Sequence, residues 1–300
     1  MPLSVRISEP EIYNQALNIW SEPSFMEAVA KLHKITAMHV KCYKGEQLVA
    51  VLPVYTKKVL GFAAIVNPIS SYYQGMNVWL EKSSYPQRTL LDSLQITRSI
   101  AHFLQKRFRK ISINLSPESV DIRGFTWEGL KAAPLYTFVH DYSAPLKPLY
   151  NEHKNINKAI KHGYSFGQET NLAEFIKLTI AMDERKKRVN GVSYQALTLF
   201  LNQLFARGFA RQYNMYLEGK IVSSEILFKG QLDKAYTIYR ATSQNDMKHG
   251  VSSLHTLSLI NELANEISEL DFCGANIPDV ARFKASFGLS LKVFFRISNG

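Results

Sequence analysis

Cysteine is almost absent from this sequence, which holds only Cys42 and Cys273 among its 300 residues. Two cysteines build no disulfide framework, and neither stands in a CxxC or Cys/His spacing of the kind that binds zinc. The sequence therefore predicts no metal site and fits a reducing compartment.

Long apolar runs are missing as well. The run VLGFAAIV at residues 59–66 is too short to span a bilayer. Residues 1–15 carry acidic residues and a proline where a secretory signal needs an apolar stretch. We therefore expect a soluble, cytoplasmic protein with no stable insertion into a membrane.

Low-complexity segments and dense basic tracts are also lacking. Hydrophobic residues make up 46% of the chain and charged residues 20%, which excludes a disordered or fibrous protein. The formal charge of +11 favours an anionic partner, so that nucleic acid, nucleotide, coenzyme A and anionic lipid all remain open. No signature of an RNA-binding module accompanies the charge, so charge alone does not select RNA.

What the chain does contain is a repeated order of elements. Hairpin patterns with central glycines occur at residues 41–58 and 211–230. Each is followed by a helical pattern (90–108 and 251–267), a short apolar strand (110–115 and 269–274), a loop and an aromatic segment. Duplication explains this order economically.

The repeat divides the chain into two predicted domains, residues 1–143 and 144–300, joined near the prolines of residues 141–150. The final strand, 291–297, could pair within its own half or back against the first domain. Hairpins that alternate with helices predict an α+β (mixed α/β) fold with predominantly antiparallel sheets.

The segment DFCGANIPDVARFKASFG at residues 271–288 combines a buried strand, a polar loop and a helix, and loops of this kind often hold active sites. Phe283 and Phe287 share one face of that helix, and Lys284 points off it. The residues by themselves also fit a packed helix with an ordinary surface lysine.

This segment resembles the closing motif of the FemAB/FemX-like peptidyltransferase family and its relatives among GNAT-type acyltransferases. Residues 153–163 and 235–243 resemble landmarks of the same family, as do NPISSYYQGM at 67–76 and DIRGFTWEG at 121–129. The resemblance implies two tandem GNAT-like domains with the acyl-CoA N-acyltransferase fold.

The resemblance also implies a reaction, the transfer of an acyl or aminoacyl group onto an amine. Lys284 matches the lysine at the family's reaction centre, where a cation would stabilise the oxyanion by about 3 kcal/mol. By family position, Asp271 is a further catalytic candidate, and Asn276, Tyr239 and Arg240 are candidates for substrate binding. Tyr72 and Tyr73 match the substrate loop of the first domain, although they also suit a packed turn.

Glu225 is the candidate general base. Its strand neighbours Ile221, Ser223 and Leu227 predict a mostly apolar face, which would raise the pKa of a carboxyl group. The alternative is an exposed position on an edge strand.

The loop MKHGVSSLHTL at residues 247–257 stands where GNAT enzymes bind the pyrophosphate of coenzyme A at a helix N-terminus. Gly250, Ser252 and Ser253 are the candidate cofactor contacts, although Met247 and Ser252 depart from the family's pattern.

The helix at residues 153–163 carries a basic stripe opposite Ile156, Ala159 and Ile160. The stripe consists of Lys154, Lys158 and Lys161. It either binds phosphates or forms a solvated face.

Together these features predict an N-acyltransferase that moves an acyl group, expected to be acetyl, from acyl-CoA to a primary amine of a small molecule or cell-envelope precursor. One alternative is Fem-type transfer from aminoacyl-tRNA, which would make tRNA a partner. The other is a noncatalytic protein that binds a nucleotide-linked envelope precursor.

Overall fold

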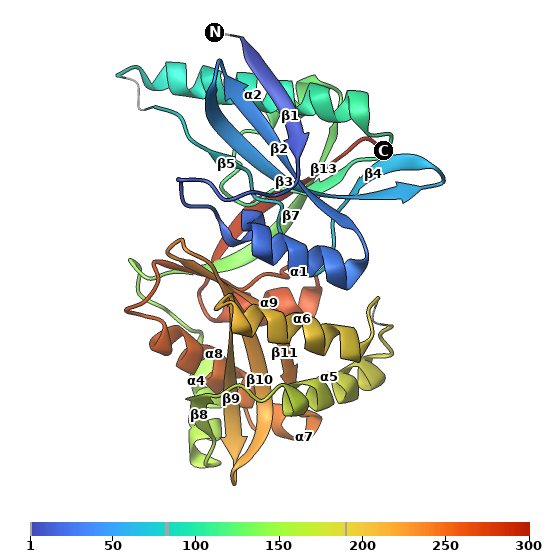
Figure 1. Ribbon diagram of the computed structural model, residues 1–300. Helices are drawn as coiled ribbons and strands as arrows, with labels where there is room; N and C mark the ends of the chain where they lie inside the picture. Colours follow the sequence, from blue (N-terminus) through green and yellow to red (C-terminus); the bar gives the residue numbers. More distant parts are fainter. Residues whose placement is uncertain (1, 82–83, 190) are drawn as a thin grey trace. The chain divides into compact units, whose positions relative to one another are not determined.

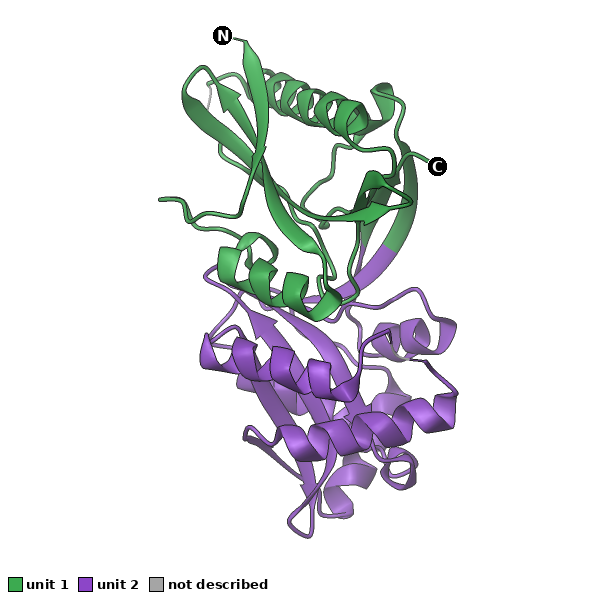
Figure 2. Ribbon diagram, turned by 45° about the vertical axis from the view of Figure 1, so that its right-hand side comes forward, with its two compact units in different colours: residues 1–135, 293–300 green, residues 136–292 purple. Residues whose placement is uncertain are grey.

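The computed structural model describes residues 2–81, 84–189 and 191–300. The chain divides into two compact units, residues 1–135 with 293–300 and residues 136–292. Figure 2 colours them separately. We call them unit 1 and unit 2.

Unit 1 contains an antiparallel sheet in the order β1-β2-β3-β4, with β5 paired to β3 (Figure 1). These strands are β1 (Leu3–Ser8), β2 (Thr36–Lys44), β3 (Gln47–Val59), β4 (Phe62–Val66) and β5 (Asn77–Val78). The helices are η1 (Ile19–Ser21), α1 (Pro23–His33), α2 (Pro86–Arg107) and α3 (Arg123–Trp127). The apolar side of α2 packs on the sheet, where Ile96, Ile100 and Leu104 are buried. The last strand of the chain, β13 (Ser290–Ser298), pairs in this unit with β6 (Ser112–Asn114), so that Arg296 lies opposite Asn114.

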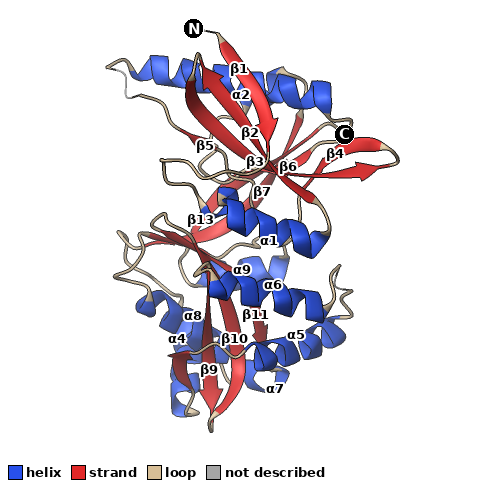
Figure 3. Ribbon diagram, viewed as in Figure 1, coloured by secondary structure: helices blue, strands red, loops and turns tan. Residues whose placement is uncertain are grey.

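Unit 2 contains strands in the order β7-β12-β11-β10-β9-β8. They are β7 (Lys131–Asp141, which begins in unit 1), β8 (Ser165–Gln168), β9 (Ala210–Leu217), β10 (Lys220–Lys229), β11 (Lys234–Thr242) and β12 (Glu269–Asp271). The helices are α4 (Tyr150–Lys161), α5 (Leu172–Lys186), α6 (Tyr194–Ala206), α7 (Gln244–Met247), α8 (Val251–Glu262) and α9 (Pro278–Ser286). Figure 3 shows these helices around the red strands of the unit.

The two units share an order of elements. Both predicted hairpins are present, and their turns contain Gly45 and Gly219 with φ of 65° and 76°, values that glycine adopts without a steric cost. In unit 2 the strands before and after α8 pair in parallel. In unit 1 an isolated parallel bridge joins Ala64 of β4, before α2, to Lys110, just before β6. The predicted α+β class with mostly antiparallel pairing is therefore confirmed.

Two details of the predicted helices are wrong. The helical pattern predicted at 251–267 ends earlier, because the α-helix stops at Glu262. Ile160 is 57% exposed, because only Ile156 and Ala159 of α4 point into the core beside α8.

Candidate functional site

The pairing of β11 with β12 stops part-way along β11, where β12 itself ends, and we call this point the opening between the two strands. Their pairing covers only three residues of each strand and ends where Tyr236 lies opposite Asp271. β11 nevertheless continues to Thr242, beside β10. A register shift between Ile226 and Leu227 of β10 accompanies this opening, since such bulges bend a strand. The segment 271–288 leaves the sheet at this opening.

Lys284 reaches from α9 back to the end of β12. Its Nζ donates a hydrogen bond of 2.6 Å to the carbonyl oxygen of Phe272 and a second bond to that of Cys273. Burial lowers the pKa of Lys284, while the charge of the Asp271 carboxylate opposes this shift. An ammonium has three donors, so these two bonds leave one N–H for another acceptor.

The loop that receives Lys284 has an unusual backbone. Cys273 and Gly274 are both in the left-handed region, with φ of 47° and 60°. The buried Asp271 carboxylate accepts from the amide of Cys273 at 2.8 Å and from the hydroxyl of Thr137 at 2.5 Å. These bonds hold the loop in a conformation that a residue with a side chain rarely adopts.

Glu225 lies on an internal strand, since β10 is paired on both sides, with β9 and β11. The alternative of an exposed edge strand is therefore wrong. Its carboxylate is 3% exposed and forms an ion pair with Arg240, whose Nε and Nη2 both donate to Oε2. Arg240 also donates to the hydroxyl of Thr256 at 2.8 Å. Thr237, three residues before Arg240 on β11, donates at 3.2 Å to the same Phe272 carbonyl that accepts from Lys284, which places the ion pair in the neighbourhood of Lys284.

Asn276 lies in the loop after β12, while Tyr239 points to the face of β11 opposite to that of Arg240. The Asn276 amide accepts from the backbone N–H of Tyr136 at 2.9 Å and donates to its carbonyl at 3.1 Å. The Asn276 side chain thus binds the backbone of β7 at two points. Tyr239, on β11, packs edge-on against Phe175 and Phe228.

The predicted cofactor loop packs against the protein's own helix α4. Gly250 has φ of 82°, and a Cβ at this position would lie 2.2 Å from the carbonyl oxygen of Asn155 in α4. The hydroxyl of Ser253 donates to buried Glu152 at 2.5 Å, and Ser252 is partly exposed. The backbone at the start of α8 is therefore in close contact with α4.

The basic stripe of α4 is exposed, as both of its predicted roles require, namely binding phosphates or forming a solvated face. Lys154 lies over the ring of Tyr150, and Lys158 donates to the carbonyl of Lys248 at 2.8 Å. The rings of His162 and His249 stack nearby with centroids 4.1 Å apart.

Tyr72 and Tyr73 belong to unit 1. Tyr73 is fully buried, and its ring meets Trp20 and Phe294 edge-on. Tyr72 is partly exposed and packs against Tyr73 and Phe294. The packed-turn alternative describes Tyr73, while Tyr72 keeps an accessible surface.

Four contributors were not identified from the sequence. Thr137 orients Asp271, Thr256 orients Arg240, and Glu152 also accepts from Ser286 of α9 at 2.8 Å. The buried His255 binds Ser223 at 2.9 Å through Nδ1, and burial keeps its pKa well below the usual range. Each of these partners is distant in sequence, so no spacing pattern marks them.

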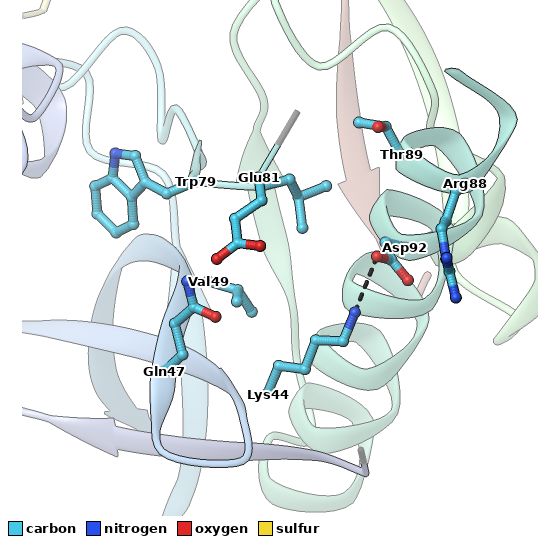
Figure 4. Close-up of a pocket in the computed structure, with 9 residues that line it drawn as sticks. Lys44, Gln47, Val49, Trp79, Glu81, Arg88, Thr89 and Asp92 are labelled. Carbon is cyan, nitrogen blue, oxygen red and sulfur yellow. Dashed lines mark hydrogen bonds and ion pairs between the residues drawn. The ribbon is translucent and has the colours of Figure 1, made fainter. Parts of the chain in front are cut away.

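Unit 1 has a pocket of about 300 Å³ between β3 and the start of α2 (Figure 4). Lys44 and Asp92 form an ion pair of 3.0 Å in it, and the Glu81 side chain turns toward Gln47 and Val49. None of the sequence candidates lines this pocket.

Among the described residues, no group of three or more histidine, cysteine, aspartate or glutamate side chains is arranged to hold a metal ion. Among the helices in the same part of the chain, none combines the length and the apolar character needed to cross a bilayer.

Comparison with known proteins shows the fold. No model of a protein family matches the chain, and no curated protein matches it in sequence. A crystal structure of FemX matches with a TM-score of 0.65 at 13% identity, over 91% of this chain and 90% of that one. The C-terminal domain of a putative lysylphosphatidylglycerol synthetase from Agrobacterium fabrum matches with a TM-score of 0.62 at 11% identity, over 92% and 87%. A tandem GNAT protein from the clavulanic acid biosynthesis pathway matches with a TM-score of 0.50 at 12% identity, over 100% and 99%. The chain therefore has a FemX-like fold, which it shares with these three structures.

Proposed function

We propose that this protein is an N-acyltransferase whose reaction centre lies in unit 2, at the opening between β11 and β12. The observation that carries the proposal is the placement of Lys284. Its ammonium is fixed at the end of β12 by two carbonyls, close to the Glu225–Arg240 ion pair. The FemX-like fold supports the same reaction class.

In the proposed reaction, the lone pair of a primary amine forms a bond to the carbonyl carbon of the acyl donor. The carbonyl oxygen becomes an oxyanion, which accepts the third N–H of Lys284, a stabilisation of about 3 kcal/mol for a well-placed donor. The tetrahedral intermediate then expels the donor's leaving group, and the amide is complete.

Glu225 takes the proton that the amine loses and returns it to the leaving group. Both bonds from Arg240 go to Oε2, which leaves Oε1 outside that ion pair. Oε1 is therefore the oxygen that accepts the proton. Asp271 has a positioning role, because its carboxylate already holds Thr137 and the loop amide of Cys273.

The sequence favours acyl-CoA as donor, with acetyl as the acyl group and a small molecule or cell-envelope precursor as acceptor in the cytoplasm. One structural observation favours aminoacyl-tRNA as a second candidate. Gly250 contacts Asn155, and Ser253 binds Glu152. Two of the three loop residues predicted to contact the pyrophosphate of coenzyme A are therefore engaged with α4. A donor recognised elsewhere on the protein does not need this loop.

The test is a titration of the purified protein with acetyl-CoA and with a charged tRNA, followed by acyl transfer to a panel of amines detected by mass spectrometry. Transfer from either donor that fails in Lys284→Met but persists in Arg282→Ala supports the proposal. Binding of neither donor, with affinity for a nucleotide sugar, would overturn it in favour of a noncatalytic binding protein.

A further inference from the structure

Strand β1 forms an open edge of the sheet in unit 1. It pairs with β2 from Leu3 opposite Lys44 to Ser8 opposite His39. Among the strands of the described residues, none pairs with its other edge. Figure 1 shows β1 at the margin of the sheet, where α2 passes beside it. An open edge of this kind presents a row of backbone donors and acceptors to any extended chain.

A groove of about 540 Å³ runs along this edge. Its floor is apolar, formed by Leu3 and Val5 of β1 and by Phe103 of α2. Its remaining wall is basic or neutral, and no acidic residue lines it. The other lining residues are Ser99, His102, Lys106 and Arg107.

The basic side chains of the groove differ in their partners. His102 contacts Glu128 at 3.3 Å. Lys106 and Arg107 are exposed in the last turn of α2. The groove therefore combines free backbone groups, apolar contacts at alternate positions and two positive charges at one end.

We propose that this groove docks an extended acidic peptide segment of a partner protein, which adds to the sheet as a strand beside β1. Main-chain hydrogen bonds to β1 would supply affinity. Every second side chain of the peptide would lie on Val5 and Phe103, and its carboxylates would meet Lys106 and Arg107. This role is separate from the acyl transfer proposed for unit 2.

Two other occupants fit less well. A second copy of the chain, paired through β1, would bring two grooves with the same positive charge together, and like charges disfavour association. An anionic lipid would use the basic and apolar residues but not the row of backbone groups along β1.

The proposal is tested with the full-length protein and a fluorescein-labelled peptide in which serines alternate with two valines and then with two glutamates, by fluorescence anisotropy at low salt. The valines and glutamates then share the face toward α2, and we expect saturable binding that a matched peptide with lysines in place of the glutamates does not show. The double variant Lys106→Glu/Arg107→Glu should weaken binding by about tenfold. The control Lys57→Glu/Lys58→Glu changes the charge equally on exposed lysines near the opposite edge of the same sheet and should bind as the parent does.

Strand addition is tested separately with two peptides methylated on alternate backbone nitrogens. Only one edge of the peptide can pair with β1, so one methylation pattern should abolish binding and the other should preserve it. Equal binding of both methylated peptides, or no binding of the parent peptide, overturns the proposal. Two further results would also overturn it. The first is a dimer, observed by sedimentation, that becomes more stable in Lys106→Glu/Arg107→Glu. The second is displacement of the peptide by phosphatidylglycerol vesicles.

Discussion

Lys284 donates a hydrogen bond to the carbonyl of Cys273, a residue whose φ of 47° is left-handed. A left-handed residue other than glycine costs about 1–2 kcal/mol, so the loop needs compensating contacts. The bonds from Lys284 to two successive carbonyls provide them, and the Asp271 carboxylate holds the intervening amide. The lysine that we assign to catalysis thus also supports the backbone of its own site.

Lys284→Met tests both roles. It removes the charge that stabilises the oxyanion, so turnover should fall by about 10²–10³-fold. It also leaves two carbonyls without a donor, so the free energy of unfolding should fall by about 1–3 kcal/mol. Steady-state kinetics and urea unfolding measure the two effects. Arg282→Ala, on an exposed residue of the same helix, is the control and should change neither. Turnover within a fewfold of the parent would remove Lys284 from the reaction.

The Glu225–Arg240 ion pair should show strong coupling. Arg240→Met leaves a carboxylate that is 3% exposed without its partner, which costs about 3–5 kcal/mol of stability for a buried pair. Adding Glu225→Gln to this variant should recover much of the loss, because no charge then remains buried. A double-mutant cycle by urea unfolding measures the coupling. Additive effects of the two substitutions would show that the ion pair does not stabilise the unit.

Gly250→Ala should lower the free energy of unfolding more than the same substitution at another glycine with a positive φ. Its Cβ would lie 2.2 Å from the carbonyl of Asn155, and φ is 82°, so both a clash and backbone strain result. Gly219 has φ of 76° but nothing within 4 Å of a Cβ, so Gly219→Ala reports the strain alone, about 1–2 kcal/mol. We expect the loss in free energy of unfolding to be larger for Gly250→Ala than for Gly219→Ala, by at least about 1 kcal/mol as measured by urea unfolding. Equal losses would mean that α4 moves away from α8 at little cost.

His39 should make unit 1 sensitive to acid. Burial lowers its pKa from the ordinary 6.5 to about 4. The backbone of Ser21 accepts from Nε2 at 3.0 Å, and Tyr13 contacts Nδ1 at 2.9 Å. Between these two pKa values the unfolded chain binds a proton that the folded chain does not. Stability therefore falls as the pH drops from 6.5 to about 4, by up to about 1.4 kcal/mol per pH unit from this residue.

His39→Gln should flatten that part of the pH–stability curve, measured by urea unfolding at a series of pH values. The exposed His153 supplies the control, since His153→Gln should keep the slope of the parent protein. A slope that is the same in His39→Gln and in the parent would show that His39 binds protons equally in the folded and unfolded states.

Local patterns in the sequence determined the elements and their order. Glycine turns at Gly45 and Gly219, alternating strands and the apolar periodicity of α2 each depend on residues that are neighbours in the chain. The duplicated order and the α+β class followed from them. The same patterns placed Lys284 on a helix after a loop, but the residues alone did not distinguish it from a surface lysine.

Only the tertiary structure decided what surrounds those residues. Glu225 proved to be paired with Arg240, and Asn276 proved to bind the backbone of Tyr136, 140 positions away in the sequence. The loop at Gly250 proved to be covered by α4, which no motif in residues 247–257 could indicate. Burial and pairing depend on segments brought together by folding, so their effects on charge and on access to a ligand are properties of the packed chain.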